Sequence, residues 1–396
     1  MKSKYTVTKL ACYVGYVVQA VVNNFLPILF IALQDIYALS YEQLARIILF
    51  NFLTQMVTDL LTPKILGFIG YRKAAMLAHI SASVGLVLLG MLPRFMENTY
   101  LAIIISMMIT AFGSGLIEVI LSPMVEMLPT SNKAGNMAVL HSFYCWGQAF
   151  TIIVTTFLVM AFGLTGWANI PLIWAAIPFV NIFAFSKVPI IEPEKEQKTD
   201  SFGQLIKDKR FFLFLVMMLC AGASEITMAQ WASMFAQQSL GVSKAVGDLA
   251  GPCAFAIFMG SGRIWYAKVS KKVSFKKTVI VLSVLCLVCY LVVGTCNIPA
   301  LSLVCCAICG FSVSIFWPGT YSAGAKVFQN GGPVMFSAFA MLGDIGCSLG
   351  PWVLGIVADG YGLNWGFVAS AIFPILMILA TFILMKSKKS NYEVNL

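Results

Sequence analysis

Long apolar runs separated by short polar connections dominate this chain. A helix needs about 20 mostly apolar residues to cross the hydrocarbon core of a bilayer. Twelve such runs occur, with boundaries defined to within a few residues. They cover residues 10–32, 44–66, 73–93, 100–127, 136–162, 167–187, 210–236, 246–268, 276–296, 299–322, 333–357 and 364–385. This pattern predicts an all-α membrane protein with twelve transmembrane helices.

One connection is longer and more polar than the others. It covers residues 188–209 and contains the run EPEKEQKTD, which is mixed in charge. Such a segment is typical of a solvated linker. We therefore predict an N-terminal six-helix bundle at 1–187, a cytoplasmic linker at 188–209 and a C-terminal six-helix bundle at 210–396.

Composition agrees with a membrane protein. Of the 396 residues, 60% are hydrophobic and only 11% are charged, which is too apolar for a water-soluble domain of this size. The lipid bilayer is therefore the expected surrounding. A formal net charge of +10 would suggest a nucleic-acid partner in a soluble protein. In a membrane protein the placement of the basic residues matters more, and we expect no nucleic-acid partner.

Basic residues gather on alternate connections between the predicted helices. One side carries Lys2, Lys4, Lys9, Lys64, Arg72, Lys73, Lys133, the linker, Lys268, Lys271, Lys272, Lys276, Lys277, Lys326, Lys386, Lys388 and Lys389. The other side has only Arg46, Arg94 and Lys244. The positive-inside rule then places both termini in the cytoplasm, which requires an even number of spans and so supports twelve. We expect a monomeric, multi-pass protein of the cell (inner) membrane.

The two halves of the chain repeat some of their features. The pair Arg72-Lys73 recurs as Lys276-Lys277, 204 residues later, and the spacing of glycine and proline in 115–123 recurs in 310–318. Internal duplication marks transporter folds, whose two halves move about a substrate site near the midplane. We therefore expect polar residues from helices of both halves to surround a central cavity.

The same register makes Asp59 in the second predicted helix equivalent to Arg263 in the eighth. Both lie nearer the cytoplasmic ends of their helices, so we predict that they gate transport through contacts between the two bundles. The alternative is that each charge pairs locally or reaches interfacial water by snorkelling. For Arg263 the two interpretations are equally open.

Glu118 lies inside the fourth apolar run, with no charged residue before it back to Glu97. An ionised carboxylate at membrane depth costs at least about 2.5 to 3.5 kcal/mol, so an acid there marks a functional site by default. Ser114 and Ser122 lie four residues to either side, on the same helical face. We predict that Glu118 couples the proton and belongs to the substrate site.

Polar side chains also share one face of the first and of the fifth predicted helix. In the fifth helix they recur at i, i+3 and i+7, and in the first helix two amides lie four residues apart. Amide, imidazole and phenol groups can donate to and accept from hydroxyls. The substrate-binding candidates on these two faces are Gln19, Asn23, His141, Tyr144 and Gln148.

The C-terminal half adds further substrate-binding candidates. The run EITMAQW begins at Glu225 and ends with Gln230 and Trp231. Amides beside an indole suit a sugar, whose ring presents hydroxyl edges and apolar C–H faces. Asp344, in the eleventh predicted helix, lies four residues before Ser348 and is also a candidate.

Polar residues inside apolar helices can instead be structural, satisfied by a neighbouring helix. We favour this interpretation for Asn51 and Gln55, and a functional role for Glu118 and Glu225. His79 lies near the cytoplasmic start of the third predicted helix and is expected to be interfacial.

No motif for a nucleotide, a metal or an organic cofactor stands out. The chain has no GxxxxGK[ST] and no GxGxxG after a strand, so ATP-driven transport by this chain alone is not expected. The 11 cysteines lie almost entirely in apolar runs without His or acid partners, which favours packing over metal binding. We expect no cofactor, no metal and a proton as the coupling ion. His141 with Glu118 is the one acid and His pair available to a membrane enzyme, and an enzyme is not expected.

Several motifs resemble the major facilitator superfamily and, within it, the fucose permease branch of sugar:proton symporters. GLIE followed by Ser-Pro, and then NMAVLHSFYCWG, are similar to that branch's motifs in helices 4 and 5. Further similarity is carried by NNFLP in helix 1, GSGR in helix 8 and SIFWPGTYS in helix 10. These motifs occupy residues 115–118, 122–123, 136–147, 23–27, 260–263 and 314–322.

The resemblance implies roles for individual residues. In that branch the helix 4 acid couples the proton, and polar residues of helices 1, 5 and 10 hold the sugar. These positions correspond here to Glu118, Asn23 or Asn24, His141, Tyr144 and Trp317. The superfamily's loop signature survives as Gly70, Arg72 and Lys73, which implies a gating role for Arg72.

The chain also departs from the branch. The branch pairs its helix 4 acid with an aspartate in helix 1, whereas NNFLP contains no acid, so coupling would rest on Glu118 alone. His141 stands where an amide is usual, and Tyr144 and Trp317 replace an asparagine and a tyrosine. The substrate need not be fucose.

The sequence therefore predicts a secondary active transporter that moves a small polyhydroxylated solute, first of all a monosaccharide, with a proton by alternating access. Protonation of Glu118 from outside would remove a charge and favour substrate binding, and release inside would follow deprotonation. The alternatives are an exporter of drugs or other amphipathic solutes, for which buried acids would be counter-charges, and an uncoupled sugar facilitator. A receptor is disfavoured because the linker and the C-terminal tail are too short for a ligand-reading or signalling domain.

Overall fold

The computed structural model describes residues 5–129, 133–191, 200–269, 272–296 and 298–386. These residues form helices and no strand, which confirms the all-α fold class. The chain divides into two compact units, Met1–Lys195 and Glu196–Leu396, and the division falls inside residues 188–209. Of the basic residues that predict orientation, those outside the described residues are Lys2, Lys4, Lys195 and Lys198 of the linker, Lys271, Lys388 and Lys389.

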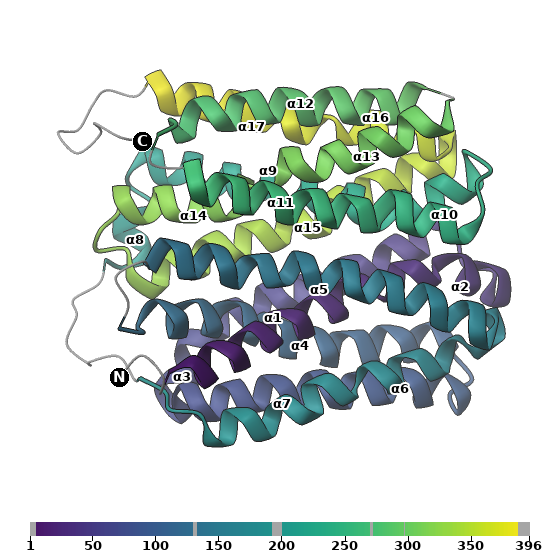
Figure 1. Ribbon diagram of the computed structural model, residues 1–396, viewed down its shortest axis with the longest axis horizontal. Coiled ribbons are helices and arrows are strands. Elements are labelled where there is room, and N and C mark those ends of the chain that lie inside the picture. The colour runs from purple at the N-terminus through teal and green to yellow at the C-terminus, as the bar shows by residue number, and fades with distance from the viewer. Residues whose placement is uncertain (1–4, 130–132, 192–199, 270–271, 297, 387–396) are drawn as a thin grey trace. The chain divides into compact units, whose positions relative to one another are not determined.

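The N-terminal unit is a bundle of long helices (Figure 1). Its elements are α1 (Thr6–Asn24), η1 (Leu26–Leu29), α2 (Phe30–Tyr37), α3 (Tyr41–Met91), η2 (Leu92–Arg94), α4 (Thr99–Glu126), α5 (Lys133–Phe162), η3 (Leu164–Asn169), α6 (Ile170–Trp174) and α7 (Ala176–Lys187). Helix α1 contacts α3, α4, α5 and α7. Its side chains therefore lie at the centre of this unit.

The element α3, of 51 residues, consists of two helices joined at a kink and contains two predicted spans. Gly70, with φ 71° and ψ 171°, breaks the helical geometry between them, and this backbone conformation favours glycine. The Tyr100 hydroxyl of α4 donates to the carbonyl of Gln43, at the start of α3, at 3.0 Å. A straight α3 would hold its two ends about 75 Å apart. The hydrogen bond therefore shows that the chain doubles back at Gly70.

The C-terminal unit is also a helical bundle. Its elements are α8 (Phe202–Leu205), α9 (Lys209–Gln238), α10 (Lys244–Asp248), the π-helical turn η4 (Leu249–Cys253), α11 (Ala254–Val269), α12 (Phe275–Thr295), α13 (Pro299–Val313), α14 (Phe316–Val327), α15 (Gly332–Tyr361), α16 (Leu363–Ser370) and α17 (Ile372–Lys386). Helix α8 forms inside the predicted linker because Ser201 and Gln204 make a capping box at its start. Helices α9 and α15 approach so closely that a Cβ at Gly346 would collide with the Leu219 carbonyl.

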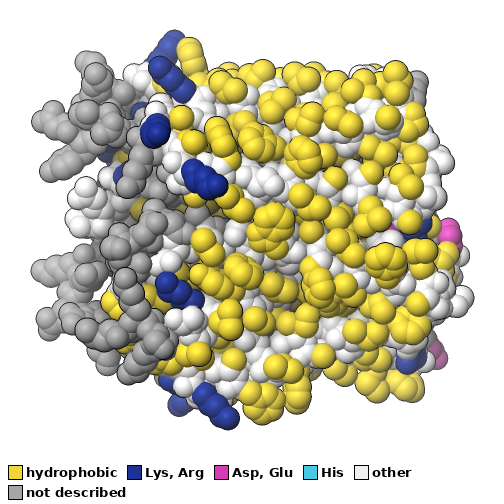
Figure 2. All heavy atoms as spheres, in the orientation of Figure 1, with side chains coloured by type: hydrophobic (Ala, Val, Ile, Leu, Met, Phe, Trp, Pro, Cys, Tyr) yellow, Lys and Arg dark blue, Asp and Glu magenta, His cyan; other side chains and the backbone are white. Residues whose placement is uncertain are grey.

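The membrane spans agree with the hydrophobic pattern. Eleven described helical stretches are long and apolar enough to cross a membrane, and the longest, Tyr41–Arg94, covers the second and third predicted spans. On the face drawn in Figure 2, hydrophobic side chains cover the sides of the helices, and Lys and Arg lie toward the helix ends. A belt of exposed apolar side chains of this kind suits lipid. The chain is therefore a multi-pass membrane protein.

Two glycines let helices of the N-terminal unit approach closely. A Cβ at Gly115 of α4 would lie 2.9 Å from the Thr58 Cβ and 3.1 Å from the Gln55 Cα of α3. A Cβ at Gly147 of α5 would lie 3.0 Å from the Val17 Cα of α1. These close approaches bring polar side chains of α1, α3, α4 and α5 within hydrogen-bonding reach.

Candidate functional site

Polar side chains meet in the N-terminal unit where α1 packs on α4. The Gln19 amide donates to Glu118 Oε2 at 2.8 Å, and the hydroxyls of Tyr16 and Ser122 hydrogen bond to each other at 2.7 Å. Gln19 is buried and Glu118 is half-buried. An amide N–H bonds a carboxylate more strongly than a neutral acid. Glu118 is thus a partly accessible acid with a donor that responds to its charge.

A chain of amides joins α1 to α3. Asn23 Oδ1 accepts hydrogen bonds from Asn51 Nδ2 at 3.2 Å and from Gln55 Nε2 at 3.1 Å. The Ser114 hydroxyl of α4 donates to Gln55 Oε1 at 2.8 Å. Asn51 and Gln55 therefore bond to a neighbouring helix, which is the interpretation that the sequence favoured. Their amides orient the Asn23 side chain.

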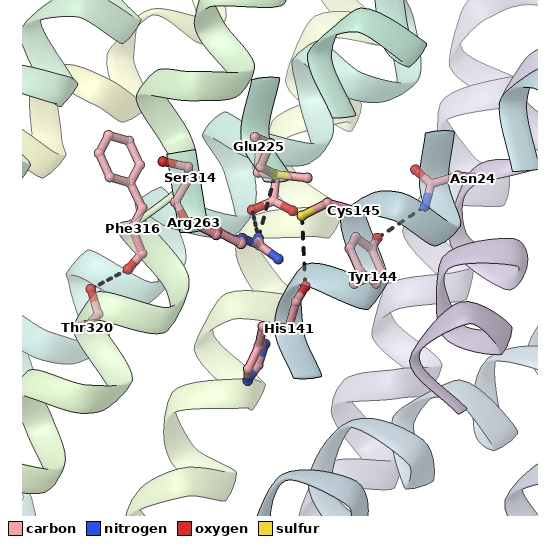
Figure 3. Close-up of polar contacts among 10 residues, drawn as sticks. Asn24, His141, Tyr144, Cys145, Glu225, Arg263, Ser314, Phe316 and Thr320 are labelled. Atoms are coloured by element: carbon pink, nitrogen blue, oxygen red, sulfur yellow. Dashed lines mark hydrogen bonds and ion pairs between the residues drawn. The ribbon is translucent and has the colours of Figure 1, made fainter. Parts of the chain in front are cut away.

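Helix α5 adds its polar face to α1. Asn24 Nδ2 donates to the Tyr144 hydroxyl at 3.2 Å (Figure 3). The His141 ring meets the Tyr16 ring edge-on, with centroids 5.1 Å apart and planes at 74°. Gln148 is buried one turn beyond Tyr144. The structure therefore brings the N-terminal candidates together around α1, and their role in substrate binding stays a prediction.

Asp59 of α3 is fully buried beside these groups. Among the described residues, neither of its carboxyl oxygens has a hydrogen-bond partner. Asp59 interacts electrostatically with Glu118. It is therefore a neighbour of the predicted coupling acid, and its predicted role in gating between the bundles stays a prediction.

The C-terminal unit contains a buried ion pair. Arg263 Nη2 of α11 lies 3.3 Å from Glu225 Oε2 of α9 (Figure 3). Arg263 Nε also donates to the Ser314 carbonyl at 3.2 Å. Arg263 is only 6% exposed and pairs locally with Glu225, so it does not reach interfacial water by snorkelling in this structure. Its predicted gating role stays a prediction. A substrate hydroxyl at Glu225 would have to compete with the guanidinium of Arg263.

Trp317 of α14 lies against α15 next to Asp344. A Cβ at Gly343 would collide with the Trp317 ring, and the Tyr321 ring stacks on Trp317 with centroids 6.3 Å apart. Trp317 is half-buried, so part of the indole is accessible, whereas Asp344 is buried. Contact between this indole and a substrate stays a prediction.

Gln230 and Trp231 of α9 are both buried. Trp231 has no exposed surface and ranks among the largest fully buried side chains of the chain. Its indole therefore fills the interior in this structure. Substrate contact by these two residues stays a prediction.

Arg72 has partners within the N-terminal unit. Its guanidinium donates to the carbonyls of Phe185, Ser186 and Val188 at 2.8, 2.9 and 2.9 Å. The last carbonyls of a helix lack intrahelical donors. Arg72 therefore caps the end of α7, and its predicted gating role stays a prediction.

The prediction that His79 is interfacial is wrong. His79 is fully buried, its Nδ1 bonds to the Ala75 carbonyl at 2.7 Å, and its Nε2 lies 2.9 Å from Asn181 Nδ2. Because Nδ1 must donate to the carbonyl, Nε2 accepts from the amide, and the ring is neutral. His79 lies nine residues beyond Gly70, or about 14 Å along the helix, which takes it deep into the bundle.

Three polar residues form a stripe on one face of α3, which is not recognised when each residue is considered separately. Asn51, Gln55 and Asp59 recur every four residues, which places them on one helical face. Taken one at a time, two look like structural amides and the third like a gating acid. The spacing is the signal that joins them, and Gln55 contacts both α1 and α4.

The N-terminal unit offers a half-buried acid and several hydrogen-bonding side chains, and the C-terminal unit offers a half-buried indole. Hydroxyl-rich solutes need such donors and acceptors, and their C–H faces pack on aromatic rings. Within the described part of the chain, no group of three or more His, Cys, Asp or Glu side chains is placed to hold a metal ion.

Solved transporter structures are similar over nearly the whole chain. The E. coli fucose:proton symporter FucP matches with a TM-score of 0.70 and 15% identity, over 98% of this chain and 100% of that chain. A D-xylose–proton symporter matches with a TM-score of 0.78 and 13% identity, over 99% and 100%. A bacterial homolog of the human lysosomal transporter Spinster matches with a TM-score of 0.76 and 11% identity, over 98% of each chain. At these identities the likeness shows a shared fold.

The sequence comparisons give the family. No curated protein sequence matches significantly. The model of the Major Facilitator Superfamily matches residues 12–351, which is most of the chain. Family and fold point to a transporter of small molecules and not to an enzyme. This chain belongs to the Major Facilitator Superfamily.

Proposed function

We propose that the protein is a proton-coupled symporter of a monosaccharide or similar polyhydroxylated solute, working by alternating access. The observation that carries this proposal is the hydrogen bond between Gln19 and Glu118, a carboxyl group at membrane depth among amides and hydroxyls. Two of the similar structures are those of a fucose:proton symporter and a D-xylose–proton symporter, which supports the proposal. The basic residues support a cell (inner) membrane location with both termini in the cytoplasm.

Coupling follows from the two states of Glu118. Gln19 donates to Glu118 at 2.8 Å, and this hydrogen bond is strongest when Glu118 is ionised. When Glu118 takes a proton from outside, that hydrogen bond weakens and the amide becomes available to a sugar hydroxyl. A buried hydroxyl left unpaired costs about 1 to 3 kcal/mol, so this donor matters for affinity. Loss of the proton to the inside restores the Gln19–Glu118 bond and favours sugar release.

Each unit also offers groups that suit a sugar. In the N-terminal unit, the hydroxyl of Tyr144 and the ring nitrogens of His141 can bond to sugar hydroxyls. In the C-terminal unit, the accessible part of Trp317 offers an aromatic face to the C–H surface of the ring.

The test is uptake by purified protein in liposomes, with the outside more acidic than the inside, using labelled L-fucose, D-xylose and a wider monosaccharide panel. Candidate sugars come from a thermal-shift screen, because a ligand at 100 times its Kd stabilises the folded state by about 2.7 kcal/mol. We expect at least one sugar to accumulate above its external concentration and to leak out when a protonophore is added. Equilibration without accumulation would identify an uncoupled facilitator. Transport of amphipathic cations and of no sugar would identify an exporter.

A further inference from the structure

Asp59 and Glu118 lie at the same level of two parallel helices. At the start of α4, Tyr100 bonds to Gln43 of α3, and further along, Ser114 of α4 bonds to Gln55 of α3. The residue numbers of the bonded partners increase along both helices, so α4 and this segment of α3 run in the same direction. One helical turn beyond Gln55 and Ser114, four residues along each chain, the paired positions are Asp59 and Glu118.

The donors near Asp59 are already used. The hydroxyls of Thr58 and Thr62 donate to carbonyls of α3 at 2.8 Å, and the Gln55 amide donates to Asn23. Asp59 is fully buried, and neither carboxyl oxygen has a hydrogen-bond partner among the described residues. A carboxylate buried without a donor is strongly disfavoured, whereas a neutral acid is tolerated.

The electrostatic interaction described for Asp59 is with an acid, and the described side-chain contacts of this segment of α3 with α1 and α4 are made by amides and a hydroxyl. Helix α1 meets this segment with the amide of Asn23, and α4 brings Glu118, which is the titratable group that interacts with Asp59. Helix α7 and the short helices before it contact α3 beyond Gly70, through His79, Ser83 and Arg72. A buried acid with a second acid beside it favours the protonated form.

We propose that Asp59 and Glu118 form a coupled acid pair that holds its first proton on Asp59 and loads the transported proton on Glu118. Two neighbouring carboxyl groups lose their protons in successive steps, because the first negative charge disfavours the second. The pair therefore alternates between no charge and one negative charge, and the only bond that forms or breaks is the O–H bond of Glu118. The transport role of this pair rests on the proposed proton coupling, whereas the protonation of Asp59 does not depend on the proposed function.

Infrared difference spectroscopy of the purified protein tests this pair without a sugar or a gradient. At neutral pH, the wild-type spectrum minus the Asp59→Asn spectrum should contain the carbonyl band of a buried protonated carboxylic acid. The matched control is Asp35→Asn, because Asp35 is exposed on α2, and the wild-type spectrum minus the spectrum of this variant should lack that band. A difference spectrum of Asp59→Asn without the band overturns the proposal.

A second variant keeps the test decisive if Asp59→Asn does not fold. In Glu118→Gln the neighbouring charge is absent, so the Asp59 band should disappear at a lower pH than in the wild type. An unchanged titration of the Asp59 band contradicts the coupling. Failure of these spectroscopic tests leaves proton-coupled transport by Glu118 intact. Full pH-driven accumulation by Glu118→Gln would refute the coupling role of Glu118, and with it the transport role of the pair, but not the protonation of Asp59.

Discussion

Breaking the buried pair of the C-terminal unit should cost different amounts depending on which partner is removed. The Arg263–Glu225 pair has an N–O distance of 3.3 Å, with side chains 5% and 8% exposed. Removing one partner of a buried ion pair costs about 3 to 5 kcal/mol. Glu225→Gln leaves a guanidinium that stays charged at any accessible pH. We expect its cost to be about 3 kcal/mol, at the lower end of that range, and equal in neutral and mildly acidic buffer.

Arg263→Met should behave differently, because the carboxyl group left behind can take a proton. The electrostatic cost of Arg263→Met cannot exceed the free energy of protonating Glu225. For an ordinary glutamate pKa of about 4.3, this free energy is about 3.7 kcal/mol near pH 7 and about 1 kcal/mol near pH 5. The folded variant binds this proton and the unfolded chain largely does not. Its stability therefore rises as the pH falls toward the ordinary glutamate pKa.

The assay is the free energy of unfolding of the purified variants in detergent at these two pH values. The control is Glu42→Gln, which removes an acid from a surface pair with side chains 47% and 36% exposed. Its cost should lie between about 0 and 1 kcal/mol at both pH values. The reasoning is refuted if Arg263→Met loses the same stability at both pH values, or if Glu225→Gln recovers in acid.

Three further changes test other contacts. Arg72→Gln removes the donors to three carbonyls at the end of α7 and should cost about 1 to 3 kcal/mol, with faster hydrogen–deuterium exchange confined to that end. Gln19→Leu removes the donor to Glu118, which destabilises the carboxylate, so the pH midpoint of sugar accumulation should rise by on the order of one unit; an unchanged midpoint contradicts the proposed role. Gly343→Ala adds a methyl group where the Trp317 ring now lies, so the indole should be displaced. Sugar titrations should then show an altered tryptophan fluorescence response and an affinity loss on the order of tenfold, or about 1.4 kcal/mol.

The helices were predictable because a helix that spans the lipid bilayer requires a long run of apolar residues. Each predicted span lies in, or within a few residues of, a membrane-competent stretch. The double-back inside α3 was also implied, since two apolar runs flank Gly70 and the basic pair Arg72-Lys73. The burial of His79 was not predicted, because the depth of a residue in the bundle depends on its distance from the break at Gly70 and not on its distance from the nearest charged residue.

The candidate site was predictable only as a set of residues. Helical spacing places Gln19 and Asn23 on one face, but it does not say that Gln19 bonds to Glu118 while Asn23 bonds to Gln55. Those pairings depend on how far each helix is shifted along its neighbour, which the close approach at Gly115 determines. The same shift places Asp59 beside Glu118, although the sequence separates them by 59 positions.

The most direct test of proton coupling is sugar accumulation by Glu118→Gln protein in liposomes under an imposed pH gradient. We predict that this variant still exchanges labelled sugar across the membrane, because glutamine mimics the protonated acid, but no longer accumulates it. The control variant Glu42→Gln, altered on the surface of α3, should accumulate sugar as the wild type does. Full accumulation by Glu118→Gln would contradict the claim that Glu118 carries the coupled proton.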